Sequence, residues 1–469
     1  MGVNGGTFET LTPSQFISFT FPNPSRSSNH YGDSLRIAVL DSPNQPPDPP
    51  KIAAMIVPKD REDDWIFSTE TGHLQLLSNS PGISRLVLVG NLPRDSHHAS
   101  STYDRRIGHD PAAIAVFEER LMPILMALSP KSCFVSEFHE IPFLSYEDGV
   151  IRSVVVDKCE GSCVGEMLIE DVEVEGDRMR EFRRRLRFKR MPNLVQTEIR
   201  VSPCRELGSS DVGIGEVEFF PDTSCLVHPY LPPMVAGVSL IASYIEDCGR
   251  LGSKPRAFCV GVGGGSLLTF LHTQLGFEVI GVESDEKVIE VAKRYFGLVE
   301  EQSLRVSVGD GIEIFKNLAG QMPSCNMGSI SALESYGNRD VLGYYRQPFD
   351  VIMVDLDSRD ARNGLSAPPL EFIQKPVLLG AKSALRKTGI LVLNVIPQNR
   401  CFYDLIIRSL LEVFRELYEL NVGNNENYII IAAVSPISPF PNVSENLIFK
   451  KLKSAVPWQY INSVRKLEG

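Results

Sequence analysis

Residues 258–271 read FCVGVGGGSLLTFL, and this stretch is the strongest indication of how the chain folds. An apolar run enters a turn with glycine at every second position, Gly261, Gly263 and Gly265, and a second apolar run follows. Because glycine has no side chain, the backbone can turn sharply there and approach a ligand closely. The pattern predicts a strand, a ligand-binding turn and a helix. It occurs at NAD, FAD and S-adenosylmethionine sites alike, so by itself it does not identify the ligand.

Strands and helices alternate on both sides of this turn. We predict a leading helix at 234–248, then strands at 256–260, 278–282, 304–308, 349–356 and 389–395, which alternate with helices at 266–275, 286–295, 312–318, 370–385 and 403–415. Two closing strands, 417–422 and 428–434, are joined by a hairpin-type turn at 423–425. The alternation predicts an α/β fold, a parallel sheet with helices on both faces. A sheet of this kind that ends in an antiparallel hairpin is the Rossmann-like, class I methyltransferase arrangement, whereas a dinucleotide dehydrogenase would continue with parallel crossovers.

Acidic residues follow the second and third predicted strands. Glu283, with Ser284 beside it, ends one strand, where a carboxylate can accept hydrogen bonds from both hydroxyls of a ribose. Asp310, followed by Gly311, ends the next strand, where class I methyltransferases bind the adenine amino group. Each acid alone could be an ordinary surface carboxylate. Together with the glycine turn, which includes Gly264, they predict an S-adenosylmethionine site at the rim where open α/β sheets bind ligands.

The fourth predicted strand ends in VIMVDLDSRD, which supplies the candidate catalytic residues Asp355 and Asp357. Asp355 would also border the cofactor. A carboxylate there can orient an acceptor amine and take its proton. Proton removal is needed because an α-ammonium, with a pKa of about 8, or a lysine ammonium, at about 10.4, has no lone pair for attack. The alternative is a pair of acids that caps the following turn. Asn394, at the end of the fifth strand, is either a further site residue or a capping residue.

The N-terminal half is richer in short β-branched runs, such as LRIAVL at 35–40 and RLVLVG at 85–90. A helix is predicted at 111–130, with a kink or break at Pro123. We expect an N-terminal tail at 1–33, a smaller strand-rich α+β domain at 34–206, a Gly- and Ser-rich linker at 207–215 and a methyltransferase domain at 216–469 with an inserted loop at 324–347.

The charge balance argues against general nucleic-acid binding, because the formal net charge is -11. One segment is strongly basic: RMREFRRRLRFKR at 178–190. It is either the solvated face of a strand or helix, or a docking surface for an acidic protein or RNA.

Other features exclude further classes of protein. The nine cysteines have no paired metal-ligand spacing, so no metal site is expected. No apolar run approaches the roughly 20 residues that a membrane-spanning helix needs. The first residues lack the pattern of a secretory signal, and we expect a cytoplasmic protein.

The motifs GVGGGSLLTFL, VIGVESDEKVIEVAKRYFG, GDGIEIF and FDVIMVDLDSRD resemble the C-terminal methyltransferase unit of the methyltransferase-like protein 13 family. That family consists of eukaryotic enzymes that methylate translation elongation factor 1-alpha (eEF1A) and are related in fold to spermidine synthases. The resemblance runs from about Leu35 to the end of the chain. It implies S-adenosylmethionine as the cofactor and eEF1A as the protein partner.

This sequence departs from the family at two places. Long members carry a preceding methyltransferase domain, to which lysine methylation is attributed, and nothing here corresponds to it. The resemblance therefore implies the N-terminal amine of eEF1A as the acceptor, with a lysine of eEF1A as the alternative. The second departure is the insertion at 324–347, whose Gly, Ser and Asn content favours a surface loop, either a spacer or a substrate-facing lid.

Two other functions remain open. An aminopropyltransferase of the spermidine synthase type would have an acid at the position of Gly264 and a Tyr-His-Glu run before the sheet, where Leu231, Pro232 and Pro233 stand. A pseudoenzyme that binds a cofactor or partner without catalysis is the third alternative. The intact set of Gly turn, Glu283, Asp310 and Asp355 argues against it.

Overall fold

The structure is a computed structural model. It describes residues 8–25, 33–44, 47–92, 102–106, 110–134, 141–176, 180–204, 213–320, 347–358, 367–397, 399–423, 427–437 and 446–467. The predicted loop at 324–347, apart from its last residue, and most of the predicted linker at 207–215 therefore lie outside the described residues.

The chain divides into two compact units, which are described separately. The first comprises Met1–Lys158, Met167–Val195 and Arg205–Glu218, and the second comprises Cys159–Glu166, Gln196–Cys204 and Phe219–Gly469. The division is not a single cut, because two short N-terminal segments group with the C-terminal residues. The domain boundaries expected from composition stay a prediction.

A four-stranded sheet forms the centre of the first unit, in the order β1-β2-β4-β3. Apolar side chains on one face pack against helix α3, and those on the other face pack against α1 and α2. The elements are β1 (Phe16–Pro22), β2 (Ser34–Asp41), β3 (Ile52–Ile56), α1 (Trp65–Ser68), α2 (Glu70–Ser78), β4 (Arg85–Asn91) and α3 (Pro111–Ala127).

One sequence-based expectation for this unit is wrong, and one of the two alternatives of another, a kink or a break at Pro123, is excluded. Residues 16–22 were assigned to a tail, but they form β1, which pairs with β2 along its whole length. Helix α3 is continuous through Pro123 and is therefore not broken there.

The first unit also contains strand β5 (Thr102–Asp104), most of β6 (Val150–Gly161) and of β7 (Gly165–Val174), and strand β8 (Glu181–Phe188). A short 3-10 helix, Lys131–Phe134, follows α3. Strands β7 and β8 are antiparallel, and their register places Arg184 opposite Asp171 and Arg185 opposite Glu170. Strands β9 (Val195–Pro203) and β10 (Phe219–Pro221) pair with each other.

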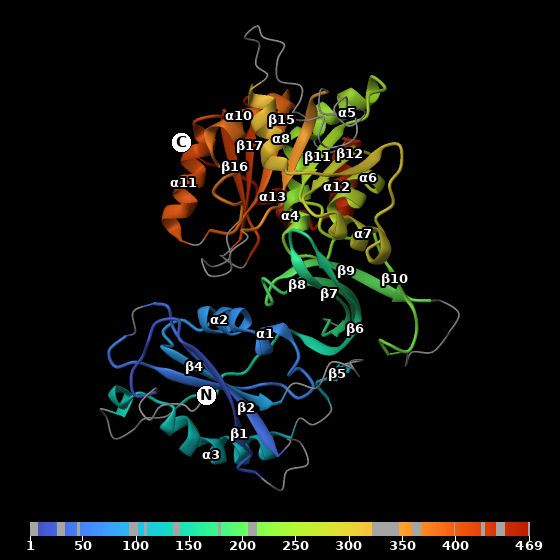
Figure 1. Cartoon of the computed structure of the whole chain (residues 1–469). Coiled ribbons are helices and arrows are strands. Elements are labelled where there is room, and N and C mark those ends of the chain that lie inside the picture. The colour runs from blue at the N-terminus through green and yellow to red at the C-terminus, as the bar shows by residue number, and fades with distance from the viewer. Residues whose placement is uncertain are drawn as a thin grey trace. The chain divides into compact units, whose positions relative to one another are not determined.

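An eight-stranded sheet forms the second unit, in the order β13-β12-β11-β14-β15-β17-β16-β18 (Figure 1). The strands are β11 (Arg256–Val260), β12 (Glu278–Glu283), β13 (Leu304–Val308), β14 (Phe349–Val354), β15 (Leu385–Val395), β16 (Glu416–Asn421), β17 (Tyr428–Ala433) and β18 (Arg465–Leu467). The strands from β13 to β15 are parallel, whereas β16, β17 and β18 are joined by antiparallel pairing. The predicted Rossmann-like sheet with an antiparallel C-terminal hairpin is therefore confirmed.

Helices cover both faces of this sheet. Alternate strand residues face opposite layers, so that Ala257 and Cys259 join one core while Phe258 and Val260 join the other. The first layer contains α4 (Leu231–Ala236), the 3-10 helix η3 (Gly237–Ile241), α5 (Ala242–Arg250), α6 (Ser266–Thr273), α7 (Glu286–Tyr295), α12 (Leu447–Ala455) and α13 (Trp458–Asn462). The second layer contains α8 (Gly311–Gly320), α10 (Lys375–Ala384) and α11 (Arg400–Leu411).

The strand order positions a ligand site. From β11 the chain adds β12 and β13 on one side and then returns to place β14 on the other side of β11. In open α/β sheets, ligands bind at the carboxyl ends of the strands where this reversal occurs. A ligand site is therefore expected at the carboxyl ends of β11 and β14.

Candidate functional site

The glycine turn after β11 lies directly against the end of β14. Gly261 has a φ of +87°, and a Cβ atom there would lie 2.2 Å from the carbonyl oxygen of Asp355. Gly265, with a φ of +79°, is the residue that precedes α6. Both residues have a positive φ, which favours glycine. At Gly261 there is also no space for a side chain. The structure thus brings together the glycine turn and Asp355 as the sequence predicted.

Strand β9 contributes to the same turn. The amide nitrogen of Gly264 donates a hydrogen bond to Oγ1 of Thr197 at 2.8 Å. A Cβ atom at Gly264 would lie 2.4 Å from Cγ2 of Thr197, and one at Gly263 would lie 2.8 Å from its Oγ1. Thr197 was not predicted as a site residue, because it lies more than 60 positions before the turn and belongs to no local motif. Its hydroxyl fixes the turn and its methyl group excludes any side chain at residue 264.

Glu283 reaches the glycine turn from the end of β12. Its Oε2 accepts a hydrogen bond from the amide nitrogen of Val262 at 3.0 Å, and its Oε1 accepts one from the amide nitrogen of Ser284 at 2.8 Å. The carboxylate is half-buried beside the turn, where a ligand that lies along the glycines would meet it. Its role in ribose binding stays a prediction.

Asp310 follows β13, but one of its oxygens has a local partner. Its Oδ1 accepts a hydrogen bond from the amide nitrogen of Ile312 at 2.8 Å, so Asp310 caps the first turn of α8. A Cβ atom at Gly311 would lie 2.3 Å from Cγ1 of Val260, which explains the need for glycine there by packing alone. Helix capping, the ordinary interpretation of such an acid, therefore accounts for Oδ1, and adenine binding by Asp310 stays a prediction.

Asp355 is the centre of a three-residue cluster. Its Oδ2 accepts a hydrogen bond from the hydroxyl of Tyr230 at 2.8 Å, and its Oδ1 accepts one from Nδ2 of Asn394 at 3.0 Å. Burial raises the pKa of Asp355 above its usual value, although both hydrogen bonds act in the opposite direction. Part of the residue remains accessible at the rim. This is a carboxylate held in a fixed orientation and made more basic than usual, as proton transfer from an amine requires.

Tyr230, just before α4, was missed by the sequence analysis. Burial and the negative charge of Asp355 raise the pKa of its hydroxyl well above the usual value, so the hydroxyl stays protonated and donates. Its ring packs edge-on against His228, with the ring centroids 4.4 Å apart. The one signal in the sequence was its place directly before Leu231, Pro232 and Pro233, the stretch compared above with the Tyr-His-Glu run of spermidine synthases.

Asp357 lies near this cluster, because in addition to burial its negative charge helps to raise the pKa of both Asp355 and Tyr230. Its Oδ2 accepts a hydrogen bond from Nε2 of Gln196 on β9 at 3.2 Å. Gln196, like Thr197, was not anticipated. The two predicted catalytic acids thus have different partners, and Asp355 has the better-defined environment for chemistry.

A further polar atom points to a ligand near the glycine turn. Ser266 begins α6 directly after Gly265 and is 8% exposed, and its hydroxyl has no hydrogen-bond partner among the described residues. Buried hydroxyls are normally paired, so an unpaired one beside the glycine turn indicates a place for a polar ligand group.

Two arginines of the basic segment at 178–190, Arg184 and Arg187, are buried and therefore do not form an open docking surface. Arg184 forms an ion pair with Asp171, and Arg187 forms ion pairs with Asp64 and Glu170. Burial would raise the pKa of Asp64, but the charges of Arg187 and Arg61 together hold it well below its usual value. The interpretation as a solvated face is therefore wrong for these residues, because they pair with acids of neighbouring strands and loops.

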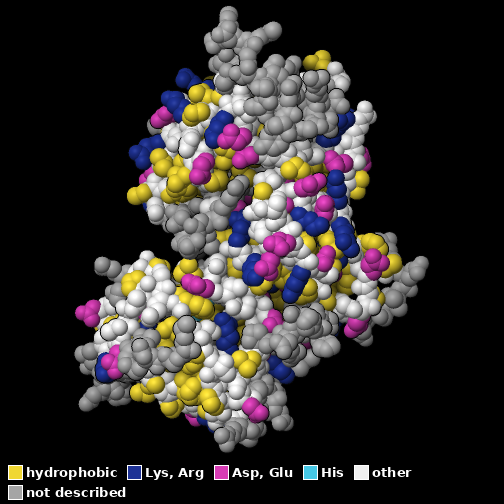
Figure 2. Space-filling view, in the orientation of Figure 1, with side chains coloured by type: hydrophobic (Ala, Val, Ile, Leu, Met, Phe, Trp, Pro, Cys, Tyr) yellow, Lys and Arg dark blue, Asp and Glu magenta, His cyan; other side chains and the backbone are white. Residues whose placement is uncertain are grey.

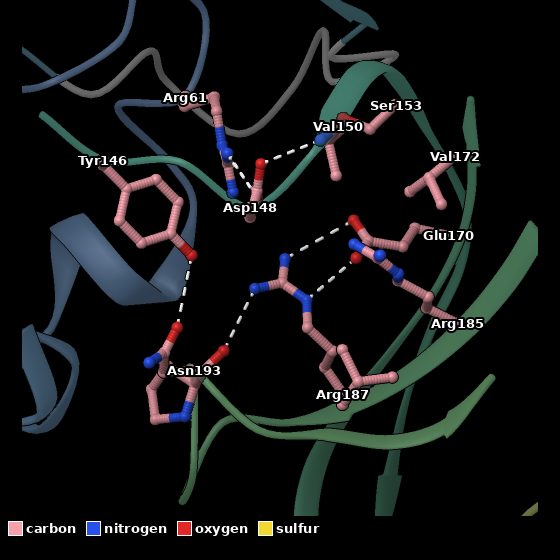
Figure 3. Close-up of a pocket in the computed structure, with 12 residues that line it drawn as sticks. Arg61, Tyr146, Asp148, Val150, Ser153, Glu170, Val172, Arg185, Arg187 and Asn193 are labelled. Atoms are coloured by element: carbon pink, nitrogen blue, oxygen red, sulfur yellow. Dashed lines mark hydrogen bonds and ion pairs between the residues drawn. The ribbon is translucent and has the colours of Figure 1, made fainter. Parts of the chain in front are cut away.

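Arg61, Arg185 and Arg187 line a pocket of about 140 Å³ within the first unit (Figure 3). Arg61, which pairs with Asp148, and Arg187, which also donates to the carbonyl oxygen of Pro192, belong to its wall. Tyr146 is turned toward Asn193 and donates to its Oδ1 at 3.2 Å. Because these arginine charges are already balanced by carboxylates, the pocket is better explained as a structural ion-pair network than as a site for a charged ligand.

Elsewhere, opposite charges are interspersed among the described side chains on the face drawn in Figure 2. No group of three or more potential metal-ligating side chains occurs within the described ranges. No described helix is both long and apolar enough to cross a membrane.

No family model matches the chain. The chain is 29% identical to the human eEF1A lysine and N-terminal methyltransferase over 417 residues, which cover 85% of this chain and 53% of that protein. The Xenopus laevis protein of the same name is 26% identical over 436 residues, 88% of this chain and 56% of its relative. The chain spans about half the length of the curated relatives it matches.

Two solved structures are similar to parts of the chain. Human methyltransferase-like protein 13 in complex with SAH is 24% identical, with a TM-score of 0.39, and the match covers 52% of this chain and 96% of that one. A probable spermidine synthase from Corynebacterium glutamicum is 13% identical, with a TM-score of 0.42 and coverage of 66% and 90%. These scores are low, so the relationship rests on the sequence alignments and is consistent with the sheet order. Over most of its length the chain is thus similar in sequence to proteins named eEF1A lysine and N-terminal methyltransferases.

Proposed function

We propose that this protein is an S-adenosylmethionine-dependent protein methyltransferase that acts on the N-terminal amine of eEF1A. The observation that carries the proposal is Asp355, a partly accessible residue whose carboxylate is held by Tyr230 and Asn394 beside the glycine turn. The names of the curated relatives support eEF1A as the substrate. The chain spans about half of their length, and of their two named activities we propose the N-terminal one.

The residues around the turn fit the proposed cofactor. Gly261, Gly263 and Gly265 form the turn at the carboxyl end of β11, where open α/β sheets bind nucleosides, and Glu283 beside it can accept hydrogen bonds from ribose hydroxyls. The unpaired hydroxyl of Ser266 can bind a polar group at the amino-acid end. When bound, S-adenosylmethionine supplies a methyl group on a positively charged sulfur. We assign no metal to this site.

Asp355 performs the proton transfer in this proposal. An N-terminal ammonium has no lone pair, so a proton must leave before the nitrogen can attack. The Asp355 carboxylate attracts the ammonium, and its raised pKa makes it a better proton acceptor than an exposed aspartate. Tyr230 and Asn394 keep both carboxylate oxygens in position. Asp357, held by Gln196, supports the same acidic rim.

The rival function, aminopropyl transfer, is disfavoured by the space at Gly264. An acid there would have to displace Thr197, whose Cγ2 lies 2.4 Å from the expected Cβ position, and the ring of Phe296 at 3.0 Å. A non-catalytic binding protein is the second rival, and it predicts cofactor binding without transfer. We also propose a cytoplasmic location, since translation elongation takes place there.

The deciding experiment is methylation of a cell extract with S-adenosylmethionine labelled in the methyl group, followed by identification of the labelled protein. The proposal predicts label in eEF1A that depends on Asp355. Transfer from decarboxylated cofactor to a polyamine would establish the first rival. Cofactor binding without label in any acceptor would establish the second.

A further inference from the structure

We infer that Asn394 binds the acceptor directly: its side-chain oxygen accepts a hydrogen bond from an N–H group of the acceptor amine. This inference rests on the proposed function and adds a substrate-binding residue to it. It restricts the acceptor class to nitrogen nucleophiles that carry at least one N–H group.

The position of Asn394 is unusual for a polar side chain. It lies near the carboxyl end of β15 and is 3% exposed, and its neighbours in the strand, Leu393 and Val395, are fully buried. The next strand in the sheet presents Ile429 opposite it. An asparagine in so apolar a strand must have its polar atoms satisfied for the folded state to be stable, because a buried polar group without a partner is costly.

Within the described residues, the side-chain nitrogen of Asn394 has a hydrogen-bond partner and its side-chain oxygen has none. Nδ2 donates to Oδ1 of Asp355 at 3.0 Å, whereas Oδ1 of Asn394 is buried and has no hydrogen-bond partner there. The orientation of the amide follows from this geometry. If it were reversed, the amide oxygen would face a carboxylate oxygen and the two would repel. The unpaired atom is therefore an acceptor, and it needs an N–H or O–H group.

The chemistry of that missing donor follows from the surroundings. The unpaired oxygen belongs to the residue that already bonds Asp355, so a donor that reaches it is next to a carboxylate. A protonated amine can bind to both residues. Its positive charge is attracted to the Asp355 carboxylate, and it has enough N–H groups to donate one hydrogen bond to Asp355 and another to Oδ1 of Asn394. In this arrangement Asp355 holds the charge and takes the proton, while Asn394 orients the nitrogen.

The inference can be tested separately from a role in holding Asp355. The measurement is the dissociation constant of two peptides with the N-terminal sequence of eEF1A, one with a free α-amine and one with a trimethylated α-amine, in the presence of S-adenosylhomocysteine. Both termini are cationic, but only the free amine has N–H groups. The wild-type protein should prefer the free amine by roughly ten- to hundredfold, the effect of hydrogen bonds from a charged donor.

Two variants complete the experiment. Asn394→Ala should reduce this preference by about tenfold or more, since it removes the oxygen. Tyr230→Phe removes the other hydrogen bond to Asp355 but keeps Asn394, so it should weaken both peptides alike and leave the preference intact. Thermal unfolding of both variants monitors the fold.

The outcomes are distinguishable. If Asn394→Ala keeps the wild-type preference while the wild-type protein methylates the free-amine peptide, the inference is wrong and the proposed function stands. If the preference falls equally in both variants, Asn394 acts through Asp355 and the direct contact is refuted. If the wild-type protein neither binds nor methylates the free-amine peptide, the proposed acceptor fails and the inference fails with it.

Discussion

The hydroxyl of Tyr230, at the start of α4, donates a hydrogen bond of 2.8 Å to Oδ2 of Asp355, at the end of β14. The two residues are 125 positions apart in the chain. Their contact connects the segment that precedes the parallel sheet to the carboxylate that we propose as the proton acceptor. Because Tyr230 donates to the ionised form, the contact favours the charged state of Asp355 against the effect of burial.

Removal of this hydroxyl should shift the pH dependence of turnover. In Tyr230→Phe the ionised carboxylate loses a donor, so the pKa of Asp355 should rise further. Asp355 must be ionised to accept a proton, and activity is therefore lost as the pH falls through its pKa. The acidic limb of kcat against pH should move to higher pH in the variant. An acidic limb at the wild-type position would show that Tyr230 does not act through Asp355.

Glu283→Ala should weaken binding of S-adenosylhomocysteine by roughly ten- to hundredfold, because hydrogen bonds to a charged group contribute about 1.5 to 3 kcal/mol. The variant should also unfold at a slightly lower temperature, since Glu283 accepts from the backbone of Val262 in the turn. Calorimetric titration and thermal unfolding measure the two effects. Glu290→Ala, which removes an exposed carboxylate of α7, is the control and should change neither. Unchanged affinity in a folded Glu283→Ala protein would place the cofactor elsewhere.

Gly264→Ala tests the close approach of β9 to the glycine turn. The added methyl group would meet Thr197 at 2.4 Å and Phe296 at 3.0 Å, so the free energy of unfolding should fall by about 1 to 3 kcal/mol. Gly249→Ala is a matched control, because nothing lies within 4 Å of its expected Cβ position in α5. That substitution should be neutral or stabilise by up to about 1 kcal/mol. Equal effects of the two substitutions in a denaturant titration would contradict the packing described here.

His73 should make the first unit sensitive to mild acid. Burial lowers its pKa to about 3, and its Nε2 lies 3.1 Å from the carbonyl oxygen of Leu86, to which the neutral ring donates. In the unfolded chain the imidazole takes a proton below pH 6.5 or so, whereas in the folded unit it does not. Stability is therefore lost as the pH falls from about 6.5 toward 3, by roughly 1.4 kcal/mol per pH unit.

The matched variant for this effect is His73→Gln, which can still donate to the carbonyl but does not titrate. Its free energy of unfolding should depend less steeply on pH between about 5 and 6.5 than that of the wild-type protein. Parallel curves for the two proteins would contradict the assignment of a buried neutral histidine.

The parallel sheet could be predicted from sequence because its signals are local. The run before Gly261 is apolar, the following run has helical spacing, and Glu283 and Asp310 occur at strand ends, so neighbouring residues contain the information. The same locality made Asp355 identifiable as a candidate. What could not be predicted is which distant side chains reach that rim. Tyr230 and Thr197 contact it through tertiary packing, which has no periodicity in the sequence.

The basic segment illustrates the same limit for electrostatics. In sequence, Arg184 and Arg187 belong to a run of positive charge, and a docking surface was a reasonable hypothesis. The antiparallel register with β7 places Asp171 opposite Arg184, and a loop residue, Asp64, reaches Arg187. Register depends on the pairing of whole strands and is not visible from the composition of one strand.

The most direct test of the central claim is mass spectrometry of the N-terminal peptide of unmethylated eEF1A after incubation with the purified protein and S-adenosylmethionine. The account predicts that the wild-type protein adds methyl groups to the α-amine, and that Asp355→Asn, which keeps the shape but removes the charge, slows this by roughly 10² to 10⁴ while cofactor affinity changes much less. An N-terminal peptide that remains unmethylated, or that is methylated equally fast by Asp355→Asn, would contradict the account.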